Sequence, residues 1–413
     1  MTRSAISDIV FPFTSHARIL AKTMMSKNWG PRTMQYNRIS ADSHIDLCWM
    51  PPDIFTSEAT PAMKSRMPYV TDGADGPYWT SKNGISFGLK NGVGPAGAKY
   101  EKGKHARADL MAATNLYEDG KNDIRRISDP HLRRKDMLSD GVDAEVIYGI
   151  LGAATKLADH EDATEMFRIY NDWLADFCRH YPERHIGLAC LPYGDIEAAR
   201  EEIFRVAGTG LRGLELSCSW DMAPMYDPMW EPLWQAADEV GLPLHFHTFP
   251  AIDPKMFDNL TDQTRRPAFF TVVSGFQMNL VNIIAAIISG GVLERYPNLK
   301  IAFGESGCGW IPYMLDRMDF EWEDRFHDLP MTMRPSDYWK RQCKATFQFD
   351  TIGTKLIEDM GVETLMWGSD YPHGDGVWPE SSRYIDEQFG HLSADDIRKI
   401  TCENAGKFYG LMN

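Results

Sequence analysis

The segment LMWGSDYPHGDGVWPES, residues 365–381, decides the fold and carries the first sign of chemistry. Thr364 to Trp367 have the apolar character of a buried strand, and Gly368 ends that strand. Asp370 and His373 follow on a loop. A carboxylate and an imidazole just past the C-terminal end of a strand suit a metal site at the mouth of a βα-barrel. The alternative is an ordinary turn, because Ser-Asp and Pro-His-Gly are also turn sequences.

The composition indicates a globular protein and not a disordered one. The 413 residues are enough for one large α/β barrel with insertions or for two domains. Hydrophobic residues make up 43% of the chain and charged residues 24%, which is the composition of a globular protein. The net charge of −15 argues against a nucleic-acid partner, because an acidic surface repels phosphate backbones. The seven cysteines contain no CxxC pair, which predicts reduced thiols, a cytoplasmic location and no zinc knuckle.

Two apolar segments could suggest a signal peptide or a membrane span, and the sequence argues against both. Asp8 interrupts the apolar core that a signal peptide needs. Residues 268–290 are apolar but contain Ser274, Gln277 and two asparagines, so we predict a buried helix and no membrane span. Residues 1–37 show no period and have no core of their own. We expect an arm that docks on the barrel or on a neighbouring subunit, and hence a dimer or larger assembly.

Beyond residue 38 the sequence alternates strands with helices. Strands that run apolar without clean alternation fit a parallel sheet covered on both faces, and eight such units close into a (β/α)8 TIM barrel. Residues 38–413 are therefore predicted to be one barrel domain. Residues 46–128 form a long insertion after the first strand, with a Gly- and Asn-rich hairpin signal, which is typical of a lid over a site. The expected strands are 38–45, 144–149, 185–191, 212–217, 243–248, 300–305, 345–350 and 364–370.

Acidic and histidine residues gather at the C-terminal ends of four of these strands, which meet at one mouth of a barrel. Residues two apart in a strand point the same way, so each strand can offer two ligands to one metal. Each residue alone has another explanation, such as a turn, a core imidazole or a helix cap. Burying three carboxylates together without a cation is strongly unfavourable, so the set predicts a metal centre. Its candidate ligands are Asp42, His44, His245, His247, Glu305, Asp370 and His373.

Four stretches carry a family resemblance that covers nearly everything from Ser40 onward. They are ADSHIDLCWMPPDIF (41–55), GLPLHFHT (241–248), GVLERYPNLKIAFGESGCGWIPYMLDRMD (291–319) and LMWGSDYPH (365–373). The chain resembles the amidohydrolase-related family, in the branch of aminocarboxymuconate semialdehyde decarboxylase and the resorcylate decarboxylases. The resemblance implies a (β/α)8 barrel with a metal at its mouth. It places the family's metal ligands on Asp42, His44, His247 and Asp370.

The chain departs from this family at Glu305, where the decarboxylases carry a catalytic histidine. A carboxylate beside a cation is a poor base but a good bridge between two metals, and seven ligands suit two ions about 3.5–4 Å apart. That set resembles dinuclear non-haem oxygenases such as the large component of 2-aminoisobutyrate hydroxylase. The resemblance implies Fe or Mn/Fe, a ferredoxin-type electron donor and a related partner chain.

Two functions are therefore open. The first is a monooxygenase that hydroxylates a small amino or carboxylic acid, with Glu305 and Asp370 as catalytic residues. The alternative is a mononuclear hydrolase or decarboxylase that uses one zinc, a metal-activated water and Asp370 as base. A catalytically silent partner subunit with the same fold is a third explanation.

Overall fold

The computed structural model describes residues 34–94, 97–150, 153, 156–157, 159–216, 218–248 and 259–413. Residues 35–413 form one compact unit. The predicted arm lies almost wholly outside the described residues, so its docking stays a prediction.

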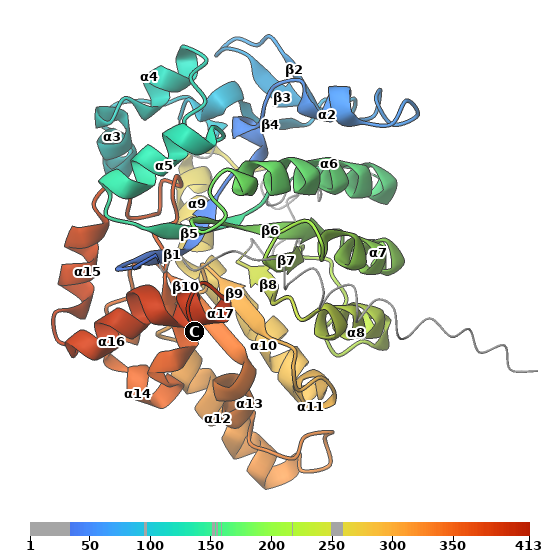
Figure 1. The fold of residues 1–413 in the computed structure, drawn as a ribbon, viewed down its shortest axis with the longest axis vertical. Coiled ribbons are helices and arrows are strands. Elements are labelled where there is room, and N and C mark those ends of the chain that lie inside the picture. The colour runs from blue at the N-terminus through green and yellow to red at the C-terminus, as the bar shows by residue number, and fades with distance from the viewer. Residues whose placement is uncertain are drawn as a thin grey trace, which may run out of the picture. The chain divides into compact units, whose positions relative to one another are not determined.

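Eight parallel strands form the barrel, and the TIM-barrel prediction is confirmed (Figure 1). Their order in the sheet follows the order of the chain. Between the first and last strands, the backbone N–H of His44 donates to the carbonyl of Tyr371 at 2.7 Å and that of Asp370 to the carbonyl of Asp42 at 2.9 Å. The strands are β1 (Ile39–His44), β5 (Ala144–Tyr148), β6 (His185–Leu191), β7 (Gly213–Leu216), β8 (Leu244–His247), β9 (Ile301–Gly304), β10 (Cys343–Phe347) and β11 (Leu365–Trp367).

Two of the helices that follow the barrel strands show the caps that their sequences supply. Asp129 accepts hydrogen bonds from the backbone of His131 and Leu132 at the start of α5, and Gly241 ends α8 in the left-handed conformation. The helices are α5 (Pro130–Ser139), α6 (His160–Arg179), α7 (Ile196–Val206), α8 (Glu231–Val240), α9 (Asp262–Gly275), α10 (Leu280–Ser289), α11 (Val292–Arg295), α12 (Ile311–Arg325), α13 (Pro335–Gln342), α14 (Ile357–Met360), α15 (Ser381–Phe389), α16 (Ala394–Arg398) and α17 (Asn404–Phe408).

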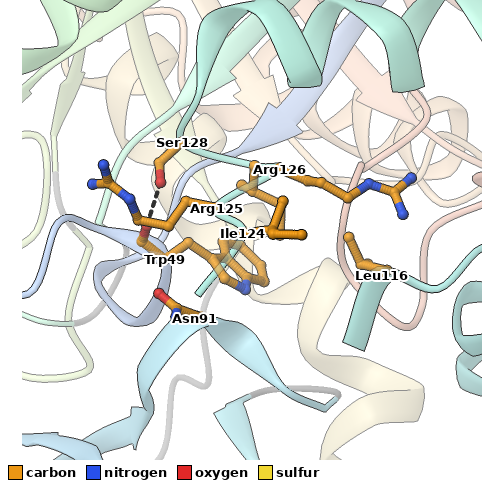
Figure 2. A pocket seen from close by; sticks show the side chains of 8 residues that line it. Trp49, Asn91, Leu116, Ile124, Arg125, Arg126 and Ser128 are labelled. Atoms are coloured by element: carbon orange, nitrogen blue, oxygen red, sulfur yellow. Dashed lines mark hydrogen bonds between the residues drawn. The ribbon is translucent and has the colours of Figure 1, made fainter. Parts of the chain in front are cut away.

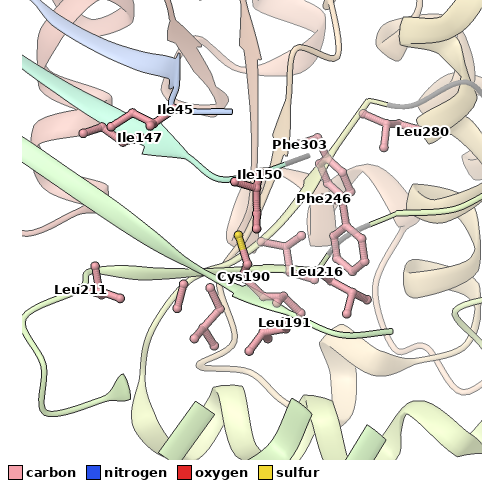
Figure 3. Packing of buried hydrophobic residues seen from close by; sticks show 14 of the residues in the cluster. Ile45, Ile147, Ile150, Cys190, Leu191, Leu211, Leu216, Phe246, Leu280 and Phe303 are labelled. Atoms are coloured by element: carbon pink, nitrogen blue, oxygen red, sulfur yellow. The ribbon is translucent and has the colours of Figure 1, made fainter. Parts of the chain in front are cut away.

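The hydrophobic core lies between the strands and this ring of helices. Every residue of β6 is buried, as the absence of alternation in its sequence predicts. Figure 3 shows part of the packing, in which Leu216, Phe246 and Phe303 from successive strands lie together. Each fully buried side chain of this kind contributes about 1.5–3 kcal/mol. This core holds the strand ends in place and so fixes the position of the residues at the barrel mouth.

The insertion after the first strand has its own three-stranded antiparallel sheet. Arg66 ties it to the start of α6 through Asp159, Glu161 and Asp162, at 2.8, 2.6 and 2.5 Å. The elements are α2 (Ile54–Glu58), β2 (Tyr69–Thr71), β3 (Tyr78–Thr80), β4 (Ser86–Leu89), α3 (Ala106–Ala113) and α4 (Leu116–Lys121).

The prediction of a buried helix over residues 268–290 is wrong for the first half of that range. The chain breaks at a short turn, Phe276–Asn279, between α9 and α10. Six residues of α10 are buried against the barrel, but none of α9 is. Apolar composition alone does not separate the two halves, because it records what a helix has to bury and not whether anything covers it.

By length and composition, Asp262–Ser289 is also the one helical run among the described residues that is apolar enough to cross a membrane. Its most apolar window has a mean hydropathy of 1.7 and is 33% buried. One such run is weak evidence for a span, since its second half is a core helix of the barrel.

Candidate metal centre

Four predicted ligands come together at the C-terminal mouth of the barrel. Nε2 of His44 lies 3.1 Å from Oδ1 of Asp42 and 3.0 Å from Oδ1 of Asp370. Nε2 of His247 lies 3.7 Å from the same Asp42 oxygen. All four side chains are at most 3% exposed. Two imidazoles and two carboxylates thus surround one point.

The atoms that face this point are the ones left without hydrogen bonds. Oδ1 of Asp42, Nε2 of His44 and of His247, and both oxygens of Asp370 are buried and hydrogen-bonded to no described residue. A buried polar atom of this kind costs about 1–3 kcal/mol unless something binds it. Mixed imidazole and carboxylate donors suit a borderline or hard divalent cation. The residues therefore fit a metal ion.

Hydrogen bonds hold the far side of Asp42 in place. Oδ2 of Asp42 accepts from the Thr346 hydroxyl at 2.6 Å and from the backbone N–H of Glu305 at 2.8 Å. Burial alone would raise the pKa of Asp42, but His247 and His44 outweigh it and hold that pKa below its usual range. A Cβ on Gly368 would lie 2.4 Å from the Cβ of Asp42, so only glycine lets β11 end here.

His373 lies beside the four ligands, with both ring nitrogens facing carboxylates. Nδ1 is 3.0 Å from Oδ1 of Asp370 and Nε2 is 2.9 Å from Oδ2 of Asp46. Its ring stacks on that of His44 at 4.0 Å. Burial would lower the pKa of His373, but Asp370 and Asp46 raise it well above its ordinary value. The sequence analysis missed Asp46, although it continues the every-second-residue series of Asp42 and His44.

The structure does not bring His245 into the cluster. Its Nδ1 is 3.1 Å from the hydroxyl of Tyr148, whose ring packs against His44 and His247. Burial lowers the pKa of His245 to about 3, so the imidazole is neutral and shares this hydrogen bond with the Tyr148 hydroxyl. The reason is register: β1 is irregular between Ser40 and Ser43, so that Asp42 and His44 both reach the cluster. No such shift occurs in β8, where His245 lies deeper by two residues, roughly 6–7 Å.

Glu305 reaches the same mouth from the end of β9. Its Oε2 lies 3.7 Å from Nε2 of His247, and its carboxyl group also lies near those of Asp370 and Asp375. Burial and the neighbouring carboxylates raise the pKa of Glu305 well above its ordinary value. Glu305 does not cap the helical turn that follows, because Asp350 accepts the backbone N–H groups of Cys308 and Gly309 at 2.8 and 2.7 Å.

Arg133 and Arg126, which precede the second barrel strand, stabilise the structure beside it. Arg133 is fully buried, pairs with both oxygens of Glu145 at 2.6 and 2.9 Å, and donates to the carbonyl of His44 at 2.9 Å. Arg126 pairs with Asp119 and Asp136.

Trp49 separates the metal centre from a small hollow behind it. Figure 2 shows this hollow, with Arg125, Ile124 and Asn91 around Trp49 and the Ser128 hydroxyl donating to the Trp49 carbonyl at 2.6 Å. The ring of Trp49 is 6.0 Å from that of His373. Trp49 is thus one wall of the site.

Comparison with known sequences identifies relatives that are decarboxylases. The chain is 25% identical over 252 residues to 2-amino-3-carboxymuconate-6-semialdehyde decarboxylase of Dictyostelium discoideum, which covers 59% of this chain and 67% of the relative. It is 26% identical over 279 residues to gamma-resorcylate decarboxylase of Rhodococcus jostii (strain RHA1), covering 63% and 80%.

Solved structures share the fold. An amidohydrolase from Mycobacterium avium subsp. paratuberculosis K-10 superposes with a TM-score of 0.69 at 18% identity, covering 92% of this chain and 99% of the other. A dihydroxybenzoic acid decarboxylase from Polaromonas, with bound manganese and the inhibitor 2-nitroresorcinol, gives a TM-score of 0.56 at 21% identity, covering 73% and 93%.

These findings overturn the first functional prediction. The prediction of a dinuclear, O2-dependent monooxygenase is wrong, because the relatives are decarboxylases and none points to the oxygenase subgroup. They match the alternative, a metal-dependent decarboxylase, and they support an enzyme with a bound metal. The amidohydrolase family model matches residues 107–411, about three quarters of the sequence. This chain belongs to the amidohydrolase family.

Proposed function

We propose that this protein is a metal-dependent decarboxylase of a small carboxylic acid whose carboxyl group is attached to an aromatic or conjugated carbon. The observation that supports this most is the set of unpaired, buried donor atoms on Asp42, His44, His247 and Asp370. Three of the relatives named above are decarboxylases, of 2-amino-3-carboxymuconate-6-semialdehyde, gamma-resorcylate and dihydroxybenzoic acid. We propose a single divalent ion, manganese or zinc.

The reaction replaces a C–CO2⁻ bond by a C–H bond. A divalent ion held by the four ligands would bind the substrate's oxygens and stabilise the negative charge left as the C–C bond breaks. The electron pair of that bond stays on the carbon that carried the carboxyl group, CO2 leaves, and this carbon takes up one proton. No electron enters or leaves, so a ferredoxin-type donor has no part in this reaction.

We assign the proton transfer to Glu305. Its carboxyl group lies 3.7 Å from Nε2 of His247 and close to the carboxyl groups of Asp370 and Asp375, at the same mouth of the barrel. The decarboxylases that this chain resembles have a histidine at this place. A carboxylic acid can deliver the same proton from the same side. Enzymes raise the pKa of a buried carboxylic acid so that it can act as a general acid. Trp49 and the stacked pair His44–His373 would form one wall beside the substrate.

The experiment is metal analysis followed by CO2 release. The purified chain should hold one ion per chain and release CO2 from at least one acid in a panel of ortho-hydroxybenzoates, carboxyvanillate and aminocarboxymuconate semialdehyde. A chelator should abolish this release and Mn²⁺ should restore it. Metal-loaded protein that releases no CO2 from the panel but hydrolyses amides or lactones would favour the hydrolase instead.

A further inference from the structure

Lys156 is a lysine without a carboxylate partner at the mouth of the barrel. It lies in the loop after β5, and the loops that follow barrel strands surround the mouth where the metal ligands gather. Two backbone hydrogen bonds of 3.2 Å shape this loop, from the N–H of Ala153 to the carbonyl of Ile150 and from the N–H of Lys156 to the carbonyl of Ala153. The Lys156 side chain is exposed, and it forms no ion pair with any residue that the structure describes.

An aromatic ring of the insertion fixes the position of this ammonium group. Nζ of Lys156 lies 5.7 Å from the centre of the ring of Phe87, which belongs to β4 and is only 9% exposed. Strand β4 packs against the short turn Leu47–Trp49, which follows the metal-binding strand β1. Burial lowers the pKa of Lys156, and attraction to Asp46 partly offsets that effect. The ammonium group therefore lies between the insertion and the wall of the metal centre, where neighbouring residues exclude part of its water.

Asp46 acts on the charge of Lys156 but does not pair with it. Oδ2 of Asp46 lies 2.9 Å from Nε2 of His373, so this carboxylate is already engaged on the side of the metal centre. The carboxyl groups of Glu305 and Asp375 lie with that of Asp370 in a separate cluster. Lys156 thus carries a positive charge that no described carboxylate neutralises at close range.

The mouth is otherwise strongly anionic. Five carboxyl groups gather there, those of Asp42, Asp46, Glu305, Asp370 and Asp375. One divalent ion offsets the charge of only two carboxylates, so a substrate with a second negative group meets repulsion unless a further cation faces that group. Lys156 supplies such a cation, and its ammonium group has three N–H donors for a carboxylate.

We propose that Lys156 binds a second carboxylate of the substrate, one that the metal ion does not hold, and that it thereby selects dicarboxylic acids. This inference rests on the proposed function, because it names the acids that the decarboxylase accepts. The ring of Phe87 holds the ammonium group in place and keeps water from one side of it, which strengthens its attraction to a carboxylate. No bond of the substrate breaks at Lys156, so the lysine contributes to affinity and hardly to kcat.

Binding of acids that are not turned over tests this role apart from catalysis. Benzoate, phthalate, isophthalate and terephthalate lack the hydroxyl group that helps to accommodate the charge left when CO2 departs. Isothermal titration calorimetry on the full, Mn²⁺-loaded chain compares their affinities. We expect at least one dicarboxylate to bind about 10–100-fold more tightly than benzoate, the range for a hydrogen bond between charged groups.

The decisive variant is Lys156→Met, which keeps an apolar side chain beside Phe87 but removes the charge. It should abolish the preference for the dicarboxylate and leave the affinity for benzoate unchanged. Lys156→Arg keeps the charge and should retain most of the preference. Lys82→Met is the matched control, because Lys82 is exposed in the turn between β3 and β4 and also forms no ion pair with a described residue. This control should bind all four acids as the wild type does.

Steady-state kinetics give a second measurement. With 2-hydroxyisophthalate, Lys156→Met should raise KM about 10–100-fold and leave kcat nearly unchanged, whereas with 2-hydroxybenzoate both constants should stay as in wild type. Dicarboxylate binding that depends on Lys156, without CO2 release from any acid, would support the role of Lys156 and refute the decarboxylase. Release of CO2 by a chain that binds benzoate and all three dicarboxylates equally would overturn the role of Lys156 alone. A Lys156→Met variant that keeps the preference would overturn it as well.

Discussion

Glu305 and Asp370 share an unusual backbone conformation, with φ angles of 48° and 56°. Each residue lies just beyond a strand end, and each sends its carboxyl group into the same mouth. The left-handed conformation costs a non-glycine residue about 1–2 kcal/mol, and such strain collects at functional sites. Asn91, Asn115 and Asp123 also have positive φ angles, but they lie in the insertion after the first strand. The two residues of this kind at the barrel mouth are the ones to which we assign proton transfer and metal binding.

The first prediction concerns Glu305→Gln, which keeps the size of the side chain but removes its acidic proton. The variant should fold, keep its one metal ion and lose roughly 10²–10⁴-fold in kcat for CO2 release, as expected for the loss of a general acid. Metal analysis and steady-state kinetics measure both quantities. Glu323→Gln, an exposed change on α12, is the control and should behave as wild type. Full turnover by Glu305→Gln would remove Glu305 from the mechanism.

The second prediction concerns the hydroxyl group that orients Asp42. Thr346→Val removes the hydrogen bond to Oδ2 of Asp42 without changing the volume of this fully buried side chain. Loss of such an outer partner lowers metal affinity by about 10–100-fold. Competition with a fluorescent chelator measures that affinity. Thr401→Val, whose hydroxyl bonds the carbonyl of Ile397 in the C-terminal helices, is the matched control and should bind metal normally.

The third prediction concerns Asp46, which holds Nε2 of His373. Asp46→Asn keeps a hydrogen-bonding oxygen but removes the charge that orients the imidazole against Asp370. We expect metal affinity about 10-fold weaker, within the range for outer partners of a metal site, and a changed pH profile of kcat. His373→Ala would instead empty the site if His373 were itself a ligand, so equal metal content in wild type and His373→Ala assigns His373 a positioning role.

The fourth prediction is a pH dependence of stability at the buried pair Arg133–Glu145. Burial alone would raise the pKa of Glu145, but Arg133 and His185 outweigh it and hold that pKa at about 2, below the ordinary 4.5. A lowered folded-state pKa stabilises the protein above pH 4.5, and this contribution is lost as the pH falls toward 2. The difference corresponds to a contribution of the order of 3 kcal/mol. Urea unfolding between pH 2 and 6 should show this slope in wild type and not in Glu145→Gln. The variant should also be about 3–5 kcal/mol less stable at pH 7, because it leaves Arg133 buried without its charged partner.

The strands and the four convergent ligands could be predicted because both depend on local sequence. Apolar runs such as 185–191 appear in the structure at the expected bounds. Asp42, His44, His247 and Asp370 lie at strand ends, and the mouth of a barrel brings strand ends together. The depth of each residue could not be read from the sequence. A register irregularity in β1 and its absence in β8 decide that His44 reaches the cluster and that His245 does not.

The exposure of α9 and the reaction could not be predicted from the sequence, for a different reason. Phe269 and Phe270 have the composition of a core helix, and only the three-dimensional arrangement shows that the barrel lies under α10 alone. The replacement of a histidine by Glu305 suggested a second metal and an oxygenase. That inference used the number of candidate ligands without their geometry. The decarboxylase relatives contradict it.

The distribution of the ligands along the chain has a consequence for how the protein is made. Asp42 and His44 are synthesised early, whereas Asp370 follows more than three hundred residues later. The hydrogen bond from the Asp370 N–H to the Asp42 carbonyl helps to close the barrel. Neither the closed barrel nor the complete ligand set exists while β11 is still being translated. The metal is therefore acquired after synthesis of the barrel is essentially finished, and a nascent chain that stalls before residue 370 exposes Asp42 and His44 with no cation to pair them.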